Sequence, residues 1–202
     1  RWMSSPTHLG LQSLKRLTGF LVGKPRLLWH YAWQDAKHFD VYSDTDWAGC
    51  PTTRKSTSGG CVMVGTHLIK SWSSTQPNIS LSSGEAEVVG VTRACAVALG
   101  YRSLTADLGL KLSSRVWTDS SAAIGICKRQ GLGKLRRLDT QMLWVQQRVR
   151  NNDLDLYYVP GEKNPADIFT KPNIPQARMG SLLHGMGCRY ADGRPSSAPE
   201  LR

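Results

Sequence analysis

Four acidic side chains, each in a different sequence context, have the types and positions to bind divalent cations together. They are Asp44 in VYSDTDWAG, Glu87 in SSGEAEVVGV, Asp119 in VWTDSSAAIG and Asp167 in NPADIFTK. These contexts indicate a strand end, the first turns of a helix, a second strand end and a helix opened by proline, and such positions can converge. Carboxylates that converge need cations to stay ionised, and Mg²⁺ prefers oxygen ligands. The four acids therefore predict a metal site.

A second glutamate competes with Glu87 for the helical position. Glu85 and Glu87 are about 200° apart around a helix, so they face different directions. Glu87 precedes Val91 by four residues and Ala94 by seven, which places it at the edge of the apolar face. Glu85 is closer to the N-terminus of the helix, where the helix dipole stabilises an acid. Helical geometry alone leaves both glutamates open.

Apolar periodicity and turn signals predict the elements that must position these acids. Three consecutive strands with short connections should pair antiparallel, and the later strands alternate with helices. The pattern is typical of an α/β fold with a mixed sheet flanked by helices. The expected strands are 39–43, 61–65, 67–74, 115–118 and 153–159, and the expected helices are about 83–108, 119–129, 138–151 and a last one opened by Pro165.

The chain is basic, which favours an anionic partner. It carries 26 lysines and arginines against 15 acids, a formal net charge of +11, and would attract nucleic acid or an acidic membrane. No apolar run approaches the roughly 20 residues that span a bilayer, so a membrane role has little support. The five cysteines are widely spaced, which favours reduced, mostly buried thiols in an intracellular protein over a zinc site.

Three regions are expected along the chain. Residues 1–37 should be a basic, partly helical lead-in, because leucines recur at helical spacing between residues 11 and 21. Residues 38–172 should form the compact domain. Residues 173–202 should be a partly disordered tail, most clearly in RPSSAPELR. Because the lead-in begins in the middle of a pattern, we expect the chain to be a piece of a longer protein.

Seven motifs occur in an order that resembles one known family. They are SPTHLGLQSLKRL, SDTDWAG, RKSTSGG, IKSWSS, LSSGEAE, WTDSSAAI and YVPGEKNPADIFTK, all between residues 5 and 172. Together they resemble the ribonuclease H domain of copia-like retrotransposon Pol polyproteins, in which that domain follows the reverse transcriptase. Any one motif alone is a weak signal, whereas the ordered set is specific.

The resemblance implies a ribonuclease H-like fold, with three antiparallel strands and two later parallel strands in one sheet. It implies hydrolysis of the RNA strand of an RNA–DNA hybrid with two Mg²⁺ ions, or Mn²⁺ in their place. Asp44, Glu87, Asp119 and Asp167 match the catalytic, metal-binding acids of the family, and Glu87 is chosen over Glu85 because EVVGV resembles the family pattern. The upstream reverse transcriptase would be a partner. The location would be intracellular, in a cytoplasmic virus-like particle or the nucleus.

A basic segment is a candidate for binding the hybrid. KRQGLGKLRRL contains five cations and no acid, and Lys134, Arg136 and Arg137 are the substrate-binding candidates within it. Cations of this kind can contact phosphates without selecting a sequence. The alternative is a solvated surface loop.

Small polar residues just before the helical glutamate are a second set of candidates. Gln76, Asn78, Ser82 and Ser83 could donate to or accept from ribose 2′-hydroxyls, the groups that distinguish RNA from DNA. Helix capping accounts for the two serines equally well. Asp46, close to Asp44, is more simply an acid that orders the following loop.

Two departures and two alternative functions accompany the resemblance. The loop VPGEKNPAD has no histidine before its aspartate, unlike cellular ribonucleases H, and Arg137 stands where many relatives have histidine.

The first alternative function is a catalytically inactive, nucleic-acid-binding remnant of a decayed element. The second is a transposase or integrase of the same broad fold, which the early position of the glutamate disfavours.

Overall fold

The structure, a computed structural model, describes residues 5–131 and 140–193, which belong to two units. The larger unit is Tyr31–Gly187. The smaller unit joins the start of the chain, up to His30, to the segment that begins at Cys188. Across the described ranges, no helix is long and apolar enough to cross a membrane.

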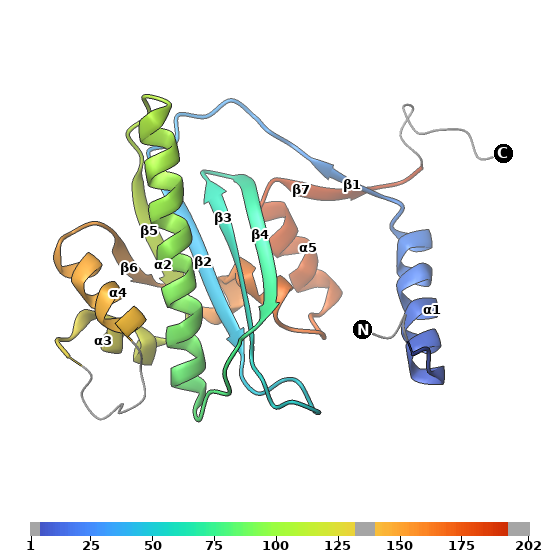
Figure 1. The fold of residues 1–202 in the computed structure, drawn as a ribbon. Helices are drawn as coiled ribbons and strands as arrows, with labels where there is room; N and C mark the ends of the chain where they lie inside the picture. The colour runs from blue at the N-terminus through green and yellow to red at the C-terminus, as the bar shows by residue number, and fades with distance from the viewer. Residues whose placement is uncertain (1–4, 132–139, 194–202) are drawn as a thin grey trace. The chain divides into compact units, whose positions relative to one another are not determined.

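The larger unit is built on a five-stranded mixed sheet (Figure 1). Strands β2 (His38–Asp46), β3 (Thr57–Val64) and β4 (His67–Thr75) pair antiparallel. Strands β5 (Ser113–Thr118) and β6 (Asp155–Tyr158) add in parallel on the other side of β2, which gives the order β4-β3-β2-β5-β6. The predicted mixed sheet, with three antiparallel and two parallel strands, is confirmed.

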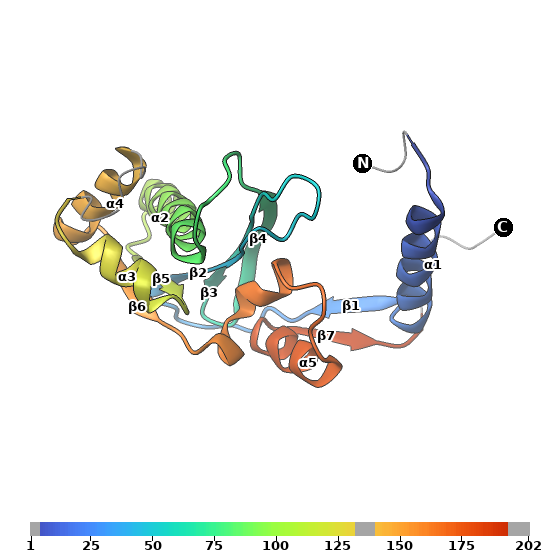
Figure 2. The ribbon, with the colours of Figure 1, turned by 90° about the horizontal axis from the view of Figure 1, so that it is seen from below.

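Helices cover both faces of this sheet (Figure 2). The long α2 (Ser83–Asp107) packs on β2 and β5, and α3 (Ser121–Lys128) and α4 (Thr140–Arg150) pack beside it. On the other side, the 3₁₀ helices η1 (Gly161–Lys163) and η2 (Pro165–Phe169) lead to α5 (Gln176–Gly185). The segment that Pro165 opens is thus a single short 3₁₀ helix, because the chain leaves the helical path at Thr170.

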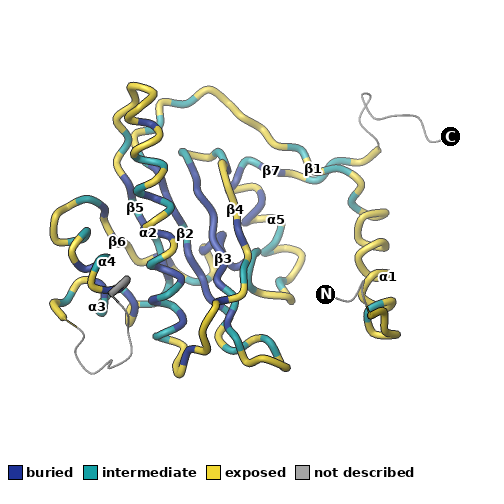
Figure 3. The backbone as a smooth tube through the Cα atoms, viewed as in Figure 1, coloured by how far each residue is buried: buried dark blue, intermediate teal, exposed yellow. Residues whose placement is uncertain are grey.

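Alternating residues of β2 separate the core from the opposite face. Phe39 and Val41 are buried against the apolar side of α2, which includes Val88 and Val91. Figure 3 shows the dark, buried stretches concentrated in β2, β3 and the inner side of α2. Asp44 lies on the other face of the strand, opposite Gly59 of β3. This alternation directs an acid away from the core, toward η2.

Two glycines allow backbone segments to approach closely around β2. A Cβ atom on Gly90 of α2 would lie 2.6 Å from Thr45 Oγ1 and 3.0 Å from Ser43 Oγ. A Cβ atom on Gly59 would lie 2.6 Å from Thr170 Cγ2. Only a residue without a side chain fits at these positions, so the glycines bring α2 and η2 onto the strands that carry the acids.

The smaller unit contains one helix and a two-stranded sheet. Helix α1 (His8–Gly23) fits the helical spacing of its leucines, and it buries none of its residues. Strands β1 (Arg26–Trp29) and β7 (Cys188–Ala191) pair antiparallel. The start of the expected lead-in and the end of the expected tail thus belong to this unit, whereas α5, within the expected tail, belongs to the larger unit. Helix α5 and strand β7 are two elements that the sequence analysis does not predict.

Candidate active site at the carboxyl end of strand β2

Three aspartates from distant parts of the chain meet at one edge of the sheet. Carboxylate oxygens of Asp44, Asp119 and Asp167 lie within 4.8 Å of one another, and this is the one such cluster of potential ligands in the part of the chain that the structure describes. Ser43 and Thr118 are partners in the parallel pairing of β2 and β5, so the residues that follow them lie side by side. The sheet register therefore positions two of the three acids.

An asparagine links the segment that carries the third acid, Asp167, to strand β2 by a hydrogen bond. Asn164 is fully buried, and its side-chain amide donates a hydrogen bond of 3.0 Å to the Ser43 carbonyl. Its carbonyl oxygen accepts from the Ala166 amide at 3.1 Å and so caps η2. Asp167 follows in the same turn and is fully buried. Sequence analysis missed Asn164, although an asparagine before a proline and a short helix is a recognisable cap signal.

The two glutamates of α2 have different environments. Ser82 caps the helix through the Glu85 amide at 3.2 Å, and the Glu85 carboxylate accepts from the Leu81 amide at 2.7 Å. Glu85 is therefore engaged at the N-terminus of the helix, where an acid is stabilised. Glu87 lies close enough to Asp44 and Asp119 for their charges to raise its pKa. Its Oε2 atom is buried and has no hydrogen-bond partner among the residues that the structure describes.

Burial and the charges of neighbouring acids make Glu87, Asp44 and Asp119 hard to ionise in the metal-free protein. Burial, followed by the charges of Asp44 and Asp119, raises the pKa of Glu87 to about 8. Burial also raises the pKa of Asp44 and of Asp119 above their ordinary values. The charge of the neighbouring Asp167 adds to this rise for both. Such a group of acids takes up either protons or cations.

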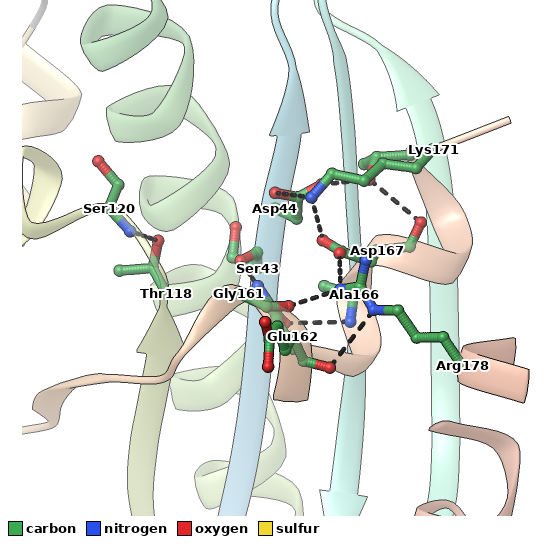
Figure 4. A network of polar contacts seen from close by, with 12 residues as sticks. Ser43, Asp44, Thr118, Ser120, Gly161, Glu162, Ala166, Asp167, Lys171 and Arg178 are labelled. Atoms are coloured by element: carbon green, nitrogen blue, oxygen red, sulfur yellow. Dashed lines mark hydrogen bonds and ion pairs between the residues drawn. The ribbon is translucent and has the colours of Figure 1, made fainter. Parts of the chain in front are cut away.

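Three donors contact the cluster (Figure 4). The Thr170 hydroxyl donates to Asp44. The Lys171 ammonium lies 2.7 Å from Asp167 Oδ1 and 4.0 Å from Asp44 Oδ1. Arg178 of α5 donates to the other oxygen of Asp167. Sequence analysis missed Arg178 completely.

The candidate substrate contacts fall into four groups. Gln76 is buried, and its amide donates to Ser58 Oγ at 2.8 Å and the Ala86 carbonyl at 2.9 Å, so it supports the sheet–helix junction. Asn78 and Ser83 are exposed near the start of α2. Ser82 is the N-cap. Lys134, Arg136 and Arg137 lie outside the described residues.

Asp46 belongs to strand β2 but not to the acidic cluster. Its carboxylate lies over the backbone of Gly49, where an added Cβ atom would overlap Asp46 Oδ2. This position agrees with the expected role of ordering the loop after the strand.

The donor set fits divalent metal ions. Carboxylate oxygens are the ligands that Mg²⁺ and Mn²⁺ accept most readily. Three acids contribute oxygens within 4.8 Å of one another, and Glu87 adds a buried oxygen without a partner. A buried polar atom that lacks a hydrogen bond costs stability unless something binds it. The residues therefore fit a metal site, in agreement with the prediction from their spacing.

The fold and the acidic cluster define a ribonuclease H-like α/β domain. In sequence, the chain is homologous to a segment of the retrovirus-related Pol polyproteins of transposons, as the motifs predicted. It is 30% identical over 176 residues to the polyprotein from transposon RE1 of Arabidopsis thaliana. The aligned region covers 85% of this chain and 12% of that protein. It is 28% identical over 132 residues to the polyprotein from transposon TNT 1-94 of Nicotiana tabacum, covering 64% of this chain and 10% of that protein.

Solved structures with similar folds include ribonucleases H. LC11-RNase H1, isolated from compost by a metagenomic approach, matches with a TM-score of 0.47 and 17% identity, over 70% of this chain and 98% of that chain. The same enzyme in complex with an RNA/DNA hybrid matches with a TM-score of 0.45 and 18% identity, over 69% and 98% of the two chains. No model of a known protein family matches the chain.

Proposed function

We propose that this domain is the ribonuclease H of a transposon Pol polyprotein and hydrolyses the RNA strand of RNA–DNA hybrids. The observation that carries the proposal is the convergence of Asp44, Asp119 and Asp167 within 4.8 Å from three separate segments. The unpartnered oxygen of Glu87 supports it. The homology to Pol polyproteins supports the interpretation of this site as the active site of a nuclease domain.

Each acid has its own part in this proposal. Asp44, near the carboxyl end of the central strand β2, would hold the metal ions together with Glu87, Asp119 and Asp167. Two bound Mg²⁺ ions would activate the attacking water and stabilise the leaving oxygen. The protein holds the carboxylates in place beforehand, through the β2–β5 pairing and the Asn164 hydrogen bond. Rigid ligands of this kind lower the cost of assembling the site.

The hybrid would bind over the same edge of the sheet. Asn78 and Ser83 are exposed beside the start of α2, where they could reach ribose hydroxyls. The net charge of +11 would attract the phosphates. Lys134, Arg136 and Arg137 remain proposed phosphate contacts.

A cleavage assay on a hybrid labelled in its RNA strand tests the proposal. We expect Mg²⁺-dependent cleavage by the wild type and a loss of at least about 100-fold in Asp119→Asn, because the variant removes a charged ligand. Asp107→Asn is the matched control: it makes the same change at an exposed acid at the end of α2 and should cleave normally. Binding of the hybrid without cleavage by the wild type would favour an inactive remnant. Cleavage of duplex DNA would favour a transposase-like nuclease.

A further inference from the structure

Lys171 places a positive charge inside the acidic cluster. Its Nζ atom lies 2.7 Å from Asp167 Oδ1 and 4.0 Å from Asp44 Oδ1, and Figure 4 shows it between these two side chains. Its charge also lowers the pKa of Asp119 and of Glu87 against the effects that raise them. One ammonium group therefore acts on all four acids of the proposed metal site.

The second cation of the cluster is held differently. Arg178 donates to Asp167 Oδ2 and, from the same nitrogen, to the Gly161 carbonyl at 2.6 Å, and its Nε donates to the Glu162 carbonyl at 3.4 Å. Two of these acceptors are backbone groups, which no metal ion would take from it. Arg178 is therefore fixed by the fold whether or not the acids bind metal.

Lys171 has no such anchor in its observed contacts. Its ammonium contacts carboxylate oxygens of Asp44 and Asp167, the groups that a metal ion would bind. Its side chain is 42% exposed, and four flexible bonds link the ammonium to the backbone. The group can therefore leave the cluster toward solvent without breaking any other observed contact.

A divalent cation and this ammonium cannot share the cluster at low cost. Two unit charges 4 Å apart repel by about 1 kcal/mol in water and by several times more near a protein interior, and a divalent ion doubles that repulsion. The carboxylate oxygens that Lys171 contacts would also be withdrawn from the metal ion. Metal binding and the observed position of Lys171 therefore compete.

We propose that Lys171 is a tethered counter-ion, which neutralises the acidic cluster in the absence of metal and is displaced when divalent cations bind. The side chain thereby sets the metal concentration that the site requires. This inference rests on the proposed function, since it assumes that the four acids bind metal.

Direct binding of Mn²⁺ to the intact chain, followed by electron paramagnetic resonance of the free ion, tests this role without an activity assay. Lys171→Met and Lys171→Gln should bind Mn²⁺ about tenfold more tightly than the wild type, because the competing charge is gone. Without metal, both variants should unfold at a lower temperature than the wild type. Mg²⁺ should then raise their unfolding temperature by more than it raises that of the wild type.

Lys163→Met is the matched control, because it removes the same charge from an exposed residue of η1, in the loop before Asp167. We expect its Mn²⁺ affinity to stay within about twofold of the wild type, as weak, screened interactions at the surface predict. An equal gain in Lys163→Met would overturn the inference, since net charge alone would then explain the effect.

Two further outcomes separate the inference from the proposed function. Unchanged Mn²⁺ affinity in both Lys171 variants, with binding lost in Asp119→Asn, would overturn the role of Lys171 and leave the metal site in place. If the wild type bound no Mn²⁺, or bound it as Asp119→Asn does, the metal site itself would be disproved. The tethered counter-ion is supported if both Lys171 variants bind Mn²⁺ more tightly and Lys163→Met does not. The Lys171 variants should also be less stable than the wild type without metal.

Discussion

Two glutamates near the start of α2 show how a separation of two residues decides the role of an acid. The Glu85 amide donates to the N-cap Ser82, and the Glu85 carboxylate accepts from the Leu81 amide. Glu87 lies near the aspartates, and within the described part of the chain one of its oxygens has no hydrogen-bond partner. The first acid stabilises the helix, whereas the second is costly in the metal-free protein. The two can therefore be distinguished by measurement.

Substitution of Glu87 should change the pH dependence of stability in the absence of metal. The pKa of Glu87 in the folded protein is about 8, against an ordinary 4.5. Between these values the folded state holds a proton that the unfolded chain has lost, so the free energy of unfolding falls as the pH rises. At about 1.4 kcal/mol per pKa unit the effect is a few kcal/mol. We expect Glu87→Gln to unfold at a higher temperature than the wild type in EDTA at pH 8, and to show a smaller difference at pH 5.

Glu85→Gln provides the control for this measurement. Loss of the Glu85 carboxylate from the helix N-terminus should lower the free energy of unfolding by about 0.5–1 kcal/mol. The loss should be similar at pH 5 and pH 8, because Glu85 contacts the helix N-terminus and not the cluster. If Glu85→Gln and not Glu87→Gln removed the pH dependence, the assignment of the helical acid would be reversed.

At the level of the elements, the approach of α2 to β2 depends on Gly90. Glu87 and Gly90 are three residues apart on the helix and so lie on neighbouring positions of one face. Because Gly90 has no side chain, that face comes close to Thr45 and Ser43. The spacing of a glutamate and a small residue in EVVG thus has a packing reason as well as a chemical one.

Alanine at Gly90 should disrupt this approach. Its Cβ atom would lie 2.6 Å from Thr45 Oγ1, so the helix or the strand must move. We expect Gly90→Ala to lower the free energy of unfolding by about 1–3 kcal/mol, as overpacked substitutions do. It should also weaken Mn²⁺ binding by displacing Glu87. Urea unfolding and metal titration measure the two effects.

Gly100→Ala is the comparison within the same helix. No atom lies within 4 Å of a Cβ at this position, so alanine should raise the free energy of unfolding by up to about 1 kcal/mol through its helix propensity. A gain in stability at both glycines would show that α2 does not pack on β2 as described.

Most elements could be predicted because their patterns are local. The alternation in β2, the apolar face of α2 and the turn at Gly65 can be read from a few neighbouring residues. Helix α5 and strand β7 could not be read in this way. Helix α5 has two buried residues, Leu182 and Leu183. Strand β7 forms by pairing with β1, which is far away in the sequence. Long-range pairing leaves little local signal.

For the whole molecule, the acids could be predicted and their supports could not. Asp44, Asp119 and Asp167 lie in recognisable motifs. The role of Arg178 and the hydrogen bond from Asn164 to β2 could not be predicted, since each acts on a residue or backbone group supplied by another part of the structure. The role of Gln76 changed for the same reason, because its amide is engaged within the protein. Contacts between distant segments carry the information that single-sequence patterns lack.

The position of the domain end can be tested by shortening the chain. Residues 31–187 should unfold in one cooperative transition and keep the Mn²⁺ site, because they comprise the larger unit. Residues 31–172 lack α5 with its buried leucines and Arg178. We expect their unfolding temperature to be lower by roughly 10 °C or more. Equal unfolding temperatures of the two fragments would instead support the boundary near residue 172, which the motifs indicate.

The convergence of Asp44, Asp119, Asp167 and Arg178 has a consequence for synthesis on the ribosome. About 130 residues separate the first of these side chains from the last. At translation rates of about 5–20 residues per second, on the order of ten seconds pass between them. During that interval the strand that carries Asp44 can form, but Asp167 and Arg178 have not yet been made. A nascent chain therefore cannot possess the complete cluster, and the last helix of the larger unit determines when the cluster is assembled.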